Sequence, residues 1–180
     1  MQPRILFTSA SGFVSGAIRW ITGSAVSHVG VQIGAEIVHA DRGGVQIDDL
    51  AGFLKGGRTL RHVYELRQEI ACDASEVFAY AKKDGDGKPL AGYDYDGMIW
   101  NVVPILSWRW LKIRLGNPLA DKNEFWCSEF AVTSLRKASS DMIPEFKGLN
   151  AEVVTPGGLL RVVSRSKSFF KVVDKKAPKA

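Results

Sequence analysis

Hydrophobic residues alternate with polar or small ones along residues 27–33, where two valines and an isoleucine occupy every second position. This period of two predicts a half-buried β-strand. Residues 34–35, Gly-Ala, have the form of a two-residue turn with glycine first, so residues 36–40 are expected to return as an antiparallel strand. The sequence therefore predicts a β-hairpin.

The same patterns predict further strands and helices along the chain. Strands are expected at residues 4–7, 45–47, 59–66 and 169–173, and helices at 12–21, 73–83 and 125–137, with a last helix capped by Thr155-Pro156. Asp48 or Asp49 is expected to cap a short helix that ends at Leu54. Residues 98–115, rich in tryptophan and leucine, fit either helices packed on the core or an amphipathic segment at a membrane surface.

Composition favours one compact domain over residues 1–180. The chain is 46% hydrophobic and 24% charged, and a chain of this length buries enough surface to need no metal or disulfide staple. It has no run of ~20 apolar residues and no convincing secretory signal. We therefore expect a cytoplasmic protein, or a virion-associated one if phage-encoded, with both cysteines reduced.

The net charge of +5 comes largely from the end of the chain, where residues 161–179 hold seven lysines and arginines. Residues 174–180 are expected to form a flexible basic tail. Such a tail is either a solvated terminus or a contact for anionic polymers or lipid headgroups. No nucleic-acid motif accompanies the charge, so no specific nucleic-acid partner is expected.

Two of the three histidines converge in the predicted hairpin. With the turn at residues 34–35, His28 and His39 lie diagonally on one face, and Gly30 opposite His39 leaves room for the two rings to meet. Paired imidazoles suit a proton relay. They also suit two ligands of a metal site, for which Asp41 would be the third. His62 lies on a later strand without a comparable partner.

Cys127 lies where a polar loop changes to an apolar helical stretch. In the first turn of a helix, the dipole favours thiolate, and free backbone N–H groups can stabilise an oxyanion. The alternative is that Cys127 is a small buried hydrophobic residue. Spacing alone does not bring it to the histidines. Cys72 has no such context and is expected to be structural.

Residues 27–34 and 38–40 resemble the histidine hairpin of NlpC-type cell-wall peptidases. Because the candidate cysteine lies downstream, in Cys127-Ser128-Glu129, the resemblance is to the circularly permuted papain-like branch of that superfamily (YiiX-like). It covers about residues 4–165 in element order. It implies an α+β fold, with an antiparallel sheet or partial barrel packed against helices and the cysteine at a helix N-terminus.

The resemblance also implies a chemistry. Cys127 would attack a carbonyl and form a thioester, His28 would accept and return the proton, and His39 would hold the tautomer of His28. Ser128 and a tyrosine of the 92–96 segment, which contains Tyr93 and Tyr95, would position the carbonyl oxygen. The expected function is hydrolysis of an amide bond in a peptide or peptidoglycan-like substrate, with no cofactor and no metal.

Two other functions are open at this point. The lecithin:retinol acyltransferase-like proteins also carry His, His and Cys in this order, so a lipid acyltransferase or phospholipase, with residues 98–115 at the membrane, is one alternative. The other is a phage or virion structural or binding protein that retains the papain-like fold with little catalytic turnover. The sequence determines neither the substrate, whether peptide, cell-wall or lipid-linked, nor the oligomeric state.

Overall fold

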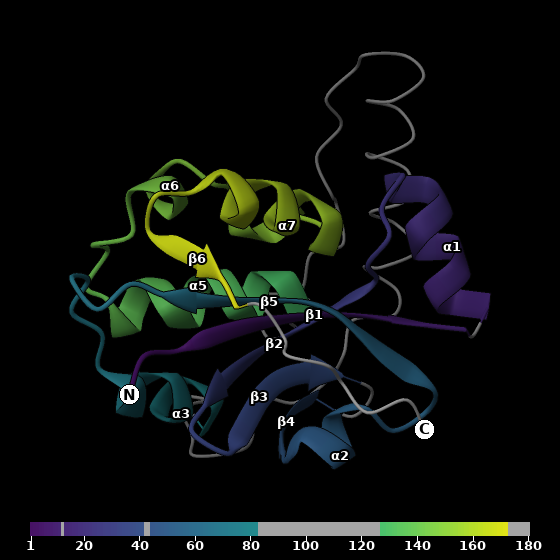
Figure 1. Cartoon of the computed structure of the whole chain (residues 1–180), viewed down its shortest axis with the longest axis horizontal. Coiled ribbons are helices and arrows are strands. Elements are labelled where there is room, and N and C mark those ends of the chain that lie inside the picture. The colour runs from purple at the N-terminus through teal and green to yellow at the C-terminus, as the bar shows by residue number, and fades with distance from the viewer. Residues whose placement is uncertain (12, 42–43, 83–126, 173–180) are drawn as a thin grey trace.

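The computed structural model describes residues 1–11, 13–41, 44–82 and 127–172, which form a sheet with helices packed against it (Figure 1). The strands are β1 (Arg4–Ala10), β2 (His28–Ile33), β3 (Glu36–Asp41), β4 (Gly44–Asp48), β5 (Arg58–Leu66) and β6 (Phe169–Lys171). The helices are α1 (Phe13–Thr22), α2 (Leu50–Phe53), α3 (Ala74–Lys82), α5 (Cys127–Ala138), α6 (Pro144–Lys147) and α7 (Pro156–Arg165), with a 3₁₀ turn η1 at Ala151–Val153.

The strands form a six-stranded sheet in the order β4-β3-β2-β1-β5-β6, and each neighbouring pair is antiparallel. Strands β2, β3 and β4 follow one another in the chain and pair in that order, as short connections favour. The first strand lies between β2 and β5, so the chain starts in the middle of the sheet. The expected α+β class with an antiparallel sheet is confirmed.

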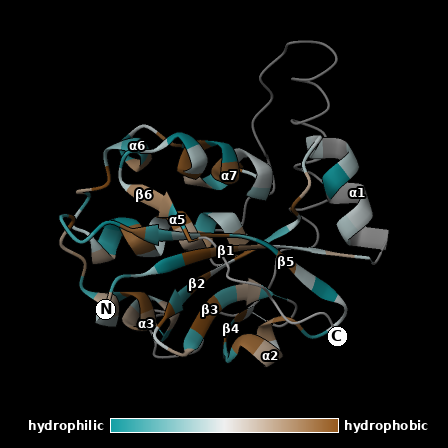
Figure 2. Ribbon diagram, viewed as in Figure 1, coloured by the Kyte–Doolittle hydropathy of each residue, from teal (hydrophilic) through white to brown (hydrophobic). Residues whose placement is uncertain are grey.

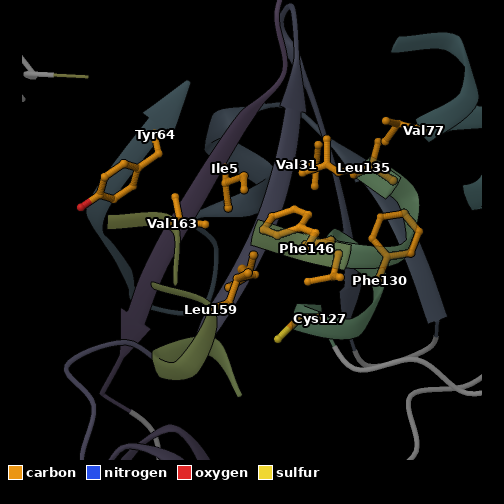
Figure 3. Close-up of a cluster of buried hydrophobic side chains, with 14 of the residues drawn as sticks. Ile5, Val31, Tyr64, Val77, Cys127, Phe130, Leu135, Phe146, Leu159 and Val163 are labelled. Atoms are coloured by element: carbon orange, nitrogen blue, oxygen red, sulfur yellow. The ribbon is translucent and has the colours of Figure 1, made fainter. Parts of the chain in front are cut away.

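The larger hydrophobic core fills the space between one face of the sheet and helices α3, α5 and α7. Val31 of β2, Phe130 and Leu135 of α5, and Leu159 of α7 lie within it (Figure 3). Figure 2 shows that hydrophobic residues are concentrated along the strands, whereas α6 and α7 also carry hydrophilic ones. The inward valines of β2 thus anchor the hairpin to α5.

The opposite face of the sheet carries a smaller cluster, made of Leu6, Ile37, Phe53 and Val63. Helix α2 supplies Phe53 and covers the sheet at β3 and β4 (Figure 1). Residues 28–31 are consequently all buried. The prediction of a half-buried strand was wrong here, because the second face is covered by a short helix and not by solvent.

Helix starts follow the predicted capping residues. The Thr155 hydroxyl accepts a hydrogen bond from the N–H of Gly158, with Pro156 in the first turn, and Asp49 caps α2 by accepting from Gly52 at 2.7 Å. The 98–115 segment lies outside the described residues. Within the described ranges, no helix has both the length and the apolar character that crossing a membrane requires.

Candidate active site

The β2–β3 hairpin positions the two histidines. Ile33 pairs with Glu36 across it, and Gly34 lies in the left-handed region at φ +64°, a conformation that glycine adopts without strain. Nε2 of His28 is 3.1 Å from Nδ1 of His39, and the two rings are perpendicular with centroids 5.1 Å apart. The structure therefore brings these side chains into direct contact on one face of the sheet.

The space left by the missing side chain of Gly30 is filled by Phe53 and Ile37. A Cβ at Gly30 would lie 2.7 Å from a methyl of Ile37 and 2.8 Å from the Phe53 ring. That ring packs on both histidines, with centroids 5.6 Å from His28 and 4.9 Å from His39. Besides leaving the face open where the two rings meet, the missing side chain lets Phe53 pack on both of them from one side.

A third polar side chain, that of Asp48, joins the two histidines in a row of hydrogen bonds. Nε2 of His39 is 3.0 Å from the carboxylate of Asp48, at the end of β4. An ionised carboxylate only accepts hydrogen bonds, so Nε2 of His39 donates, and its Nδ1 then accepts from Nε2 of His28. In this arrangement Nδ1 of His28 carries the lone pair. The row of hydrogen bonds therefore leaves His28 with its basic nitrogen at the far end.

Burial determines the charge of both imidazoles. It lowers the pKa of His28 well below 6.5, assisted by the neighbouring His39 and by the positive charge of Arg58, and opposed by Asp41. Burial also lowers the pKa of His39, although the hydrogen bond to Asp48 raises it in part. Both histidines are consequently neutral at pH 7, which is the form that can accept a proton.

Cys127 is the first residue of α5 and lies at the margin of the large core (Figure 3). Its thiol accepts backbone hydrogen bonds from Val29 and Ser128. Val29 directly follows His28 in β2, so the sulfur contacts the strand one residue from the histidine. Cys127 and His28 are far apart in the sequence, and the packing of α5 on β2 brings the thiol to the backbone of the strand that begins with His28.

The thiol is protonated at rest. Burial raises the pKa of Cys127 to about 11, against the opposing backbone hydrogen bonds from Val29 and Ser128. The negative charge of Asp41 raises this pKa further and the positive charge of Arg58 lowers it. The expectation that the helix N-terminus favours thiolate is corrected, because the loss of hydration in a 2% exposed side chain outweighs the helix dipole.

Of the residues expected to position the carbonyl oxygen, the structure describes only Ser128. Ser128 is fully buried, and its hydroxyl donates a 2.5 Å hydrogen bond to the carbonyl of Val154. Its hydroxyl is committed in this way, and its backbone N–H donates to the Cys127 thiol. Tyr93 and Tyr95 lie outside the described residues.

An ion pair lies beside the histidines. The guanidinium of Arg58 donates to the carboxylate of Asp41 and, at 3.0 Å, to the carbonyl of Phe53. Asp41 lies on the histidine face, as the alternation along β3 predicted, and one ligand atom from each of His28, His39 and Asp41 lies within 4.8 Å of the other two.

The remaining cysteine and histidine lie elsewhere. Cys72 is half-buried near the start of α3, and burial together with Asp73 raises the pKa of its thiol to about 11. His62 of β5 lies beside Tyr64, with ring centroids 6.5 Å apart. Neither belongs to the site, which agrees with the sequence-based expectation.

Asp48, Phe53 and Arg58 were not among the site residues predicted from sequence. A signal for the first was present, because the pattern of the predicted strand at 45–47, extended by one residue, places Asp48 on the face that Gln46 shares with His39. Phe53 lies in α2 and Arg58 in β5, and both reach the hairpin only through tertiary packing. No periodicity in the sequence signals that approach.

No protein-family model matches the chain. It is similar to the probable lipoprotein peptidase YaeF of Escherichia coli (strain K12), with 26% identity over 188 residues. The match covers 93% of this chain and 65% of that protein, so the chain spans somewhat less than two thirds of the relative's length. The relative carries the name of a peptidase, which agrees with the peptidase-like resemblance of the sequence.

Proposed function

We propose that this chain is a thiol hydrolase that cleaves an amide bond in a peptide or peptidoglycan-like substrate, on a circularly permuted papain-like fold. Cys127 is the nucleophile, His28 is the general base and acid, and His39 and Asp48 orient His28. The observation that carries the proposal is the row of hydrogen bonds from Asp48 through His39 to His28. It leaves a basic nitrogen on the strand that the Cys127 thiol contacts.

The resting charges dictate how the reaction starts. Because the Cys127 thiol is protonated and His28 is neutral, the proton passes from Sγ to Nδ1 of His28 as Sγ attacks the substrate carbonyl carbon. The imidazolium that forms is stabilised through His39 by the Asp48 carboxylate. General-base assistance of this kind contributes roughly 10²–10⁴-fold in rate.

The remaining steps return the site to its starting state. His28 gives its proton to the amine nitrogen as the C–N bond breaks, which leaves a thioester on Cys127. A water molecule, deprotonated by His28, then attacks the thioester, and the carboxylic acid product leaves as the thiol regains its proton. Backbone N–H groups at the start of α5 are suited to stabilise the oxyanion in both halves.

The chemistry of the site and the name of the relative support this substrate class. A neutral thiol and a neutral imidazole need no charged substrate, and an acyl carbonyl is the group that a thiol attacks. The peptidase name of the E. coli relative favours peptide amides over lipid esters.

The test is hydrolysis of defined peptides and of muropeptides from purified cell walls, followed by mass spectrometry of the new amine and carboxyl ends. We expect cleavage by the wild-type chain, loss of roughly 10²-fold or more in Cys127→Ala and His28→Ala, and little change in Cys72→Ser and His62→Gln. Cleavage that survives Cys127→Ala would refute the proposal. Deacylation of phospholipid vesicles without any peptide cleavage would favour the lipid enzyme instead.

A further inference from the structure

The face of the sheet that holds the two histidines also has the donor set of a metal site. His28, His39 and Asp41 each offer one ligand atom, and these three atoms lie within 4.8 Å of one another. They come from two adjacent strands, which fix their spacing. Two imidazoles and a carboxylate are ligands that suit zinc and similar divalent transition ions.

The distances fit such an ion after small movements. Zinc–nitrogen bonds of ~2.0–2.1 Å at a tetrahedral angle put the two ligating nitrogens roughly 3.3–3.4 Å apart. The facing nitrogens of His28 and His39 are 3.1 Å apart, so they need to separate by only a few tenths of an ångström. Asp41 needs to approach by about 1.5 Å at most, within the reach of a side-chain rotation.

Outer partners of the kind that metal ligands have are already in place. Asp48 accepts from Nε2 of His39 and so directs the Nδ1 lone pair of His39 toward the site. Arg58 pairs with Asp41, and Phe53 packs on both imidazoles. A carboxylate behind a histidine ligand fixes its tautomer and raises its affinity for metal.

We propose that His28, His39 and Asp41 bind a divalent transition ion of the zinc class, and that the bound ion blocks the thiol chemistry. The ion replaces the proton that lies between the two histidines. His28 then ligates through Nε2 and carries its own proton on Nδ1, so it has no lone pair left to accept the thiol proton. This second half of the inference rests on the proposed function, whereas the binding site itself does not.

The binding half is tested by isothermal titration of the chelator-treated full chain with Zn²⁺ alone. We expect one ion per chain, with affinity reduced at least tenfold in His39→Gln and in Asp41→Asn and unchanged in the matched control His62→Gln. Urea unfolding of each variant verifies that it folds. Equal affinity in His39→Gln, or an equal loss in His62→Gln, would overturn the site.

The Cys127→Ser variant separates this ligand set from simple capture by a thiol. Zinc affinity within about threefold of wild type supports the His-His-Asp site. A loss as large as that in His39→Gln assigns the ion to the sulfur and overturns it.

The blocking half is tested by hydrolysis with saturating Zn²⁺ and then with excess chelator. Loss of cleavage with zinc and its recovery with chelator supports the block, and unchanged cleavage with the site saturated overturns it. If zinc binds as expected but no peptide is cleaved in chelator, the proposed function fails while the metal site stands.

Discussion

Asp48 is predicted to set the tautomers of both histidines, and its replacement tests that directly. In the structure the Asp48 carboxylate lies 3.0 Å from Nε2 of His39, which puts the His39 proton on Nε2 and the His28 proton on Nε2 as well. Replacing Asp48 with alanine removes the acceptor that holds this order. The perturbation leaves both imidazoles in place and changes only which nitrogens carry protons.

The expected loss of rate in Asp48→Ala follows from the strength of the Asp48–His39 hydrogen bond and from the solvent exposure of Asp48. A hydrogen bond to a charged group contributes about 1.5–3 kcal/mol, and the lower end applies because the Asp48 side chain is 32% exposed and water screens its charge. About 1.5 kcal/mol corresponds to roughly a tenfold change in an equilibrium or a rate. We therefore expect about a tenfold lower kcat in Asp48→Ala and a smaller loss in Asp48→Asn, whose amide oxygen still accepts.

The assay needs no substrate. Two-bond ¹⁵N–¹H correlation spectra of labelled protein at pH 7.5, with chelator present, show which nitrogen of each imidazole is protonated. We expect protons on Nε2 of His28 and His39 in the wild type, and a mixture of tautomers in Asp48→Ala. The neighbouring Asp49→Ala is the matched control: it removes the α2 cap, at about 1 kcal/mol of stability, and leaves the tautomers unchanged.

A proton on Nδ1 of His39 in the wild-type spectrum would refute the reasoning. So would Asp48→Ala spectra identical to the wild type, because the carboxylate would then not direct the row of hydrogen bonds. A tautomer change without any change in kcat would leave the geometry intact and remove His39 from the mechanism.

Three further predictions concern the thiol, the glycine and the buried imidazoles. In a Cys72→Ser background, thiolate absorbance should appear with a midpoint near pH 11 and vanish in the added Cys127→Ser, and a midpoint below pH 9 would contradict the buried neutral thiol. Gly30→Ala should lower the free energy of unfolding by about 1–3 kcal/mol through overpacking, whereas Gly148→Ala, whose new Cβ meets nothing within 4 Å, should change it by less than about 0.5 kcal/mol. Because the folded pKa of His28 lies below the unfolded value of 6.5, its contribution to stability is full above pH 6.5 and is lost as the pH falls below it. Urea unfolding between pH 7.5 and 5 should show this loss, and an undiminished slope in His28→Gln would contradict it.

The hairpin was predictable from sequence because its geometry is local. A two-residue turn fixes the register, and a period of two then fixes which side chains share a face. The observed pairing of Ile33 with Glu36 and of Gln32 with Ile37 is the predicted one. Once the register is set, the meeting of His28 with His39 follows without knowledge of the rest of the chain.

What surrounds the hairpin was not predictable, because it depends on tertiary packing. Asp48 and Asp49 are adjacent carboxylates with similar local contexts, and only the docking of α2 assigns one to His39 and the other to the helix cap. The approach of Phe53 to Gly30 has the same origin. The charge state of Cys127 depends on how deeply α5 is buried, which a helix-start pattern does not report.

The buried thiol changes how activation of this site has to be understood. A cysteine kept as thiolate is ready for any electrophile, whereas in the proposed mechanism the neutral Cys127 gains its nucleophilic form only while its proton is being transferred to the neutral His28. Transfer is favourable only if the imidazolium that results is stabilised, and the carboxylate available through His39 is that of Asp48. The proposed mechanism therefore ties reactivity to the hydrogen bonds from Asp48 through His39 to His28, and not to the helix dipole at Cys127. In that mechanism, a metal ion between the two histidines would prevent activation of the Cys127 thiol without contacting its sulfur. A proton on the wrong imidazole nitrogen would have the same effect.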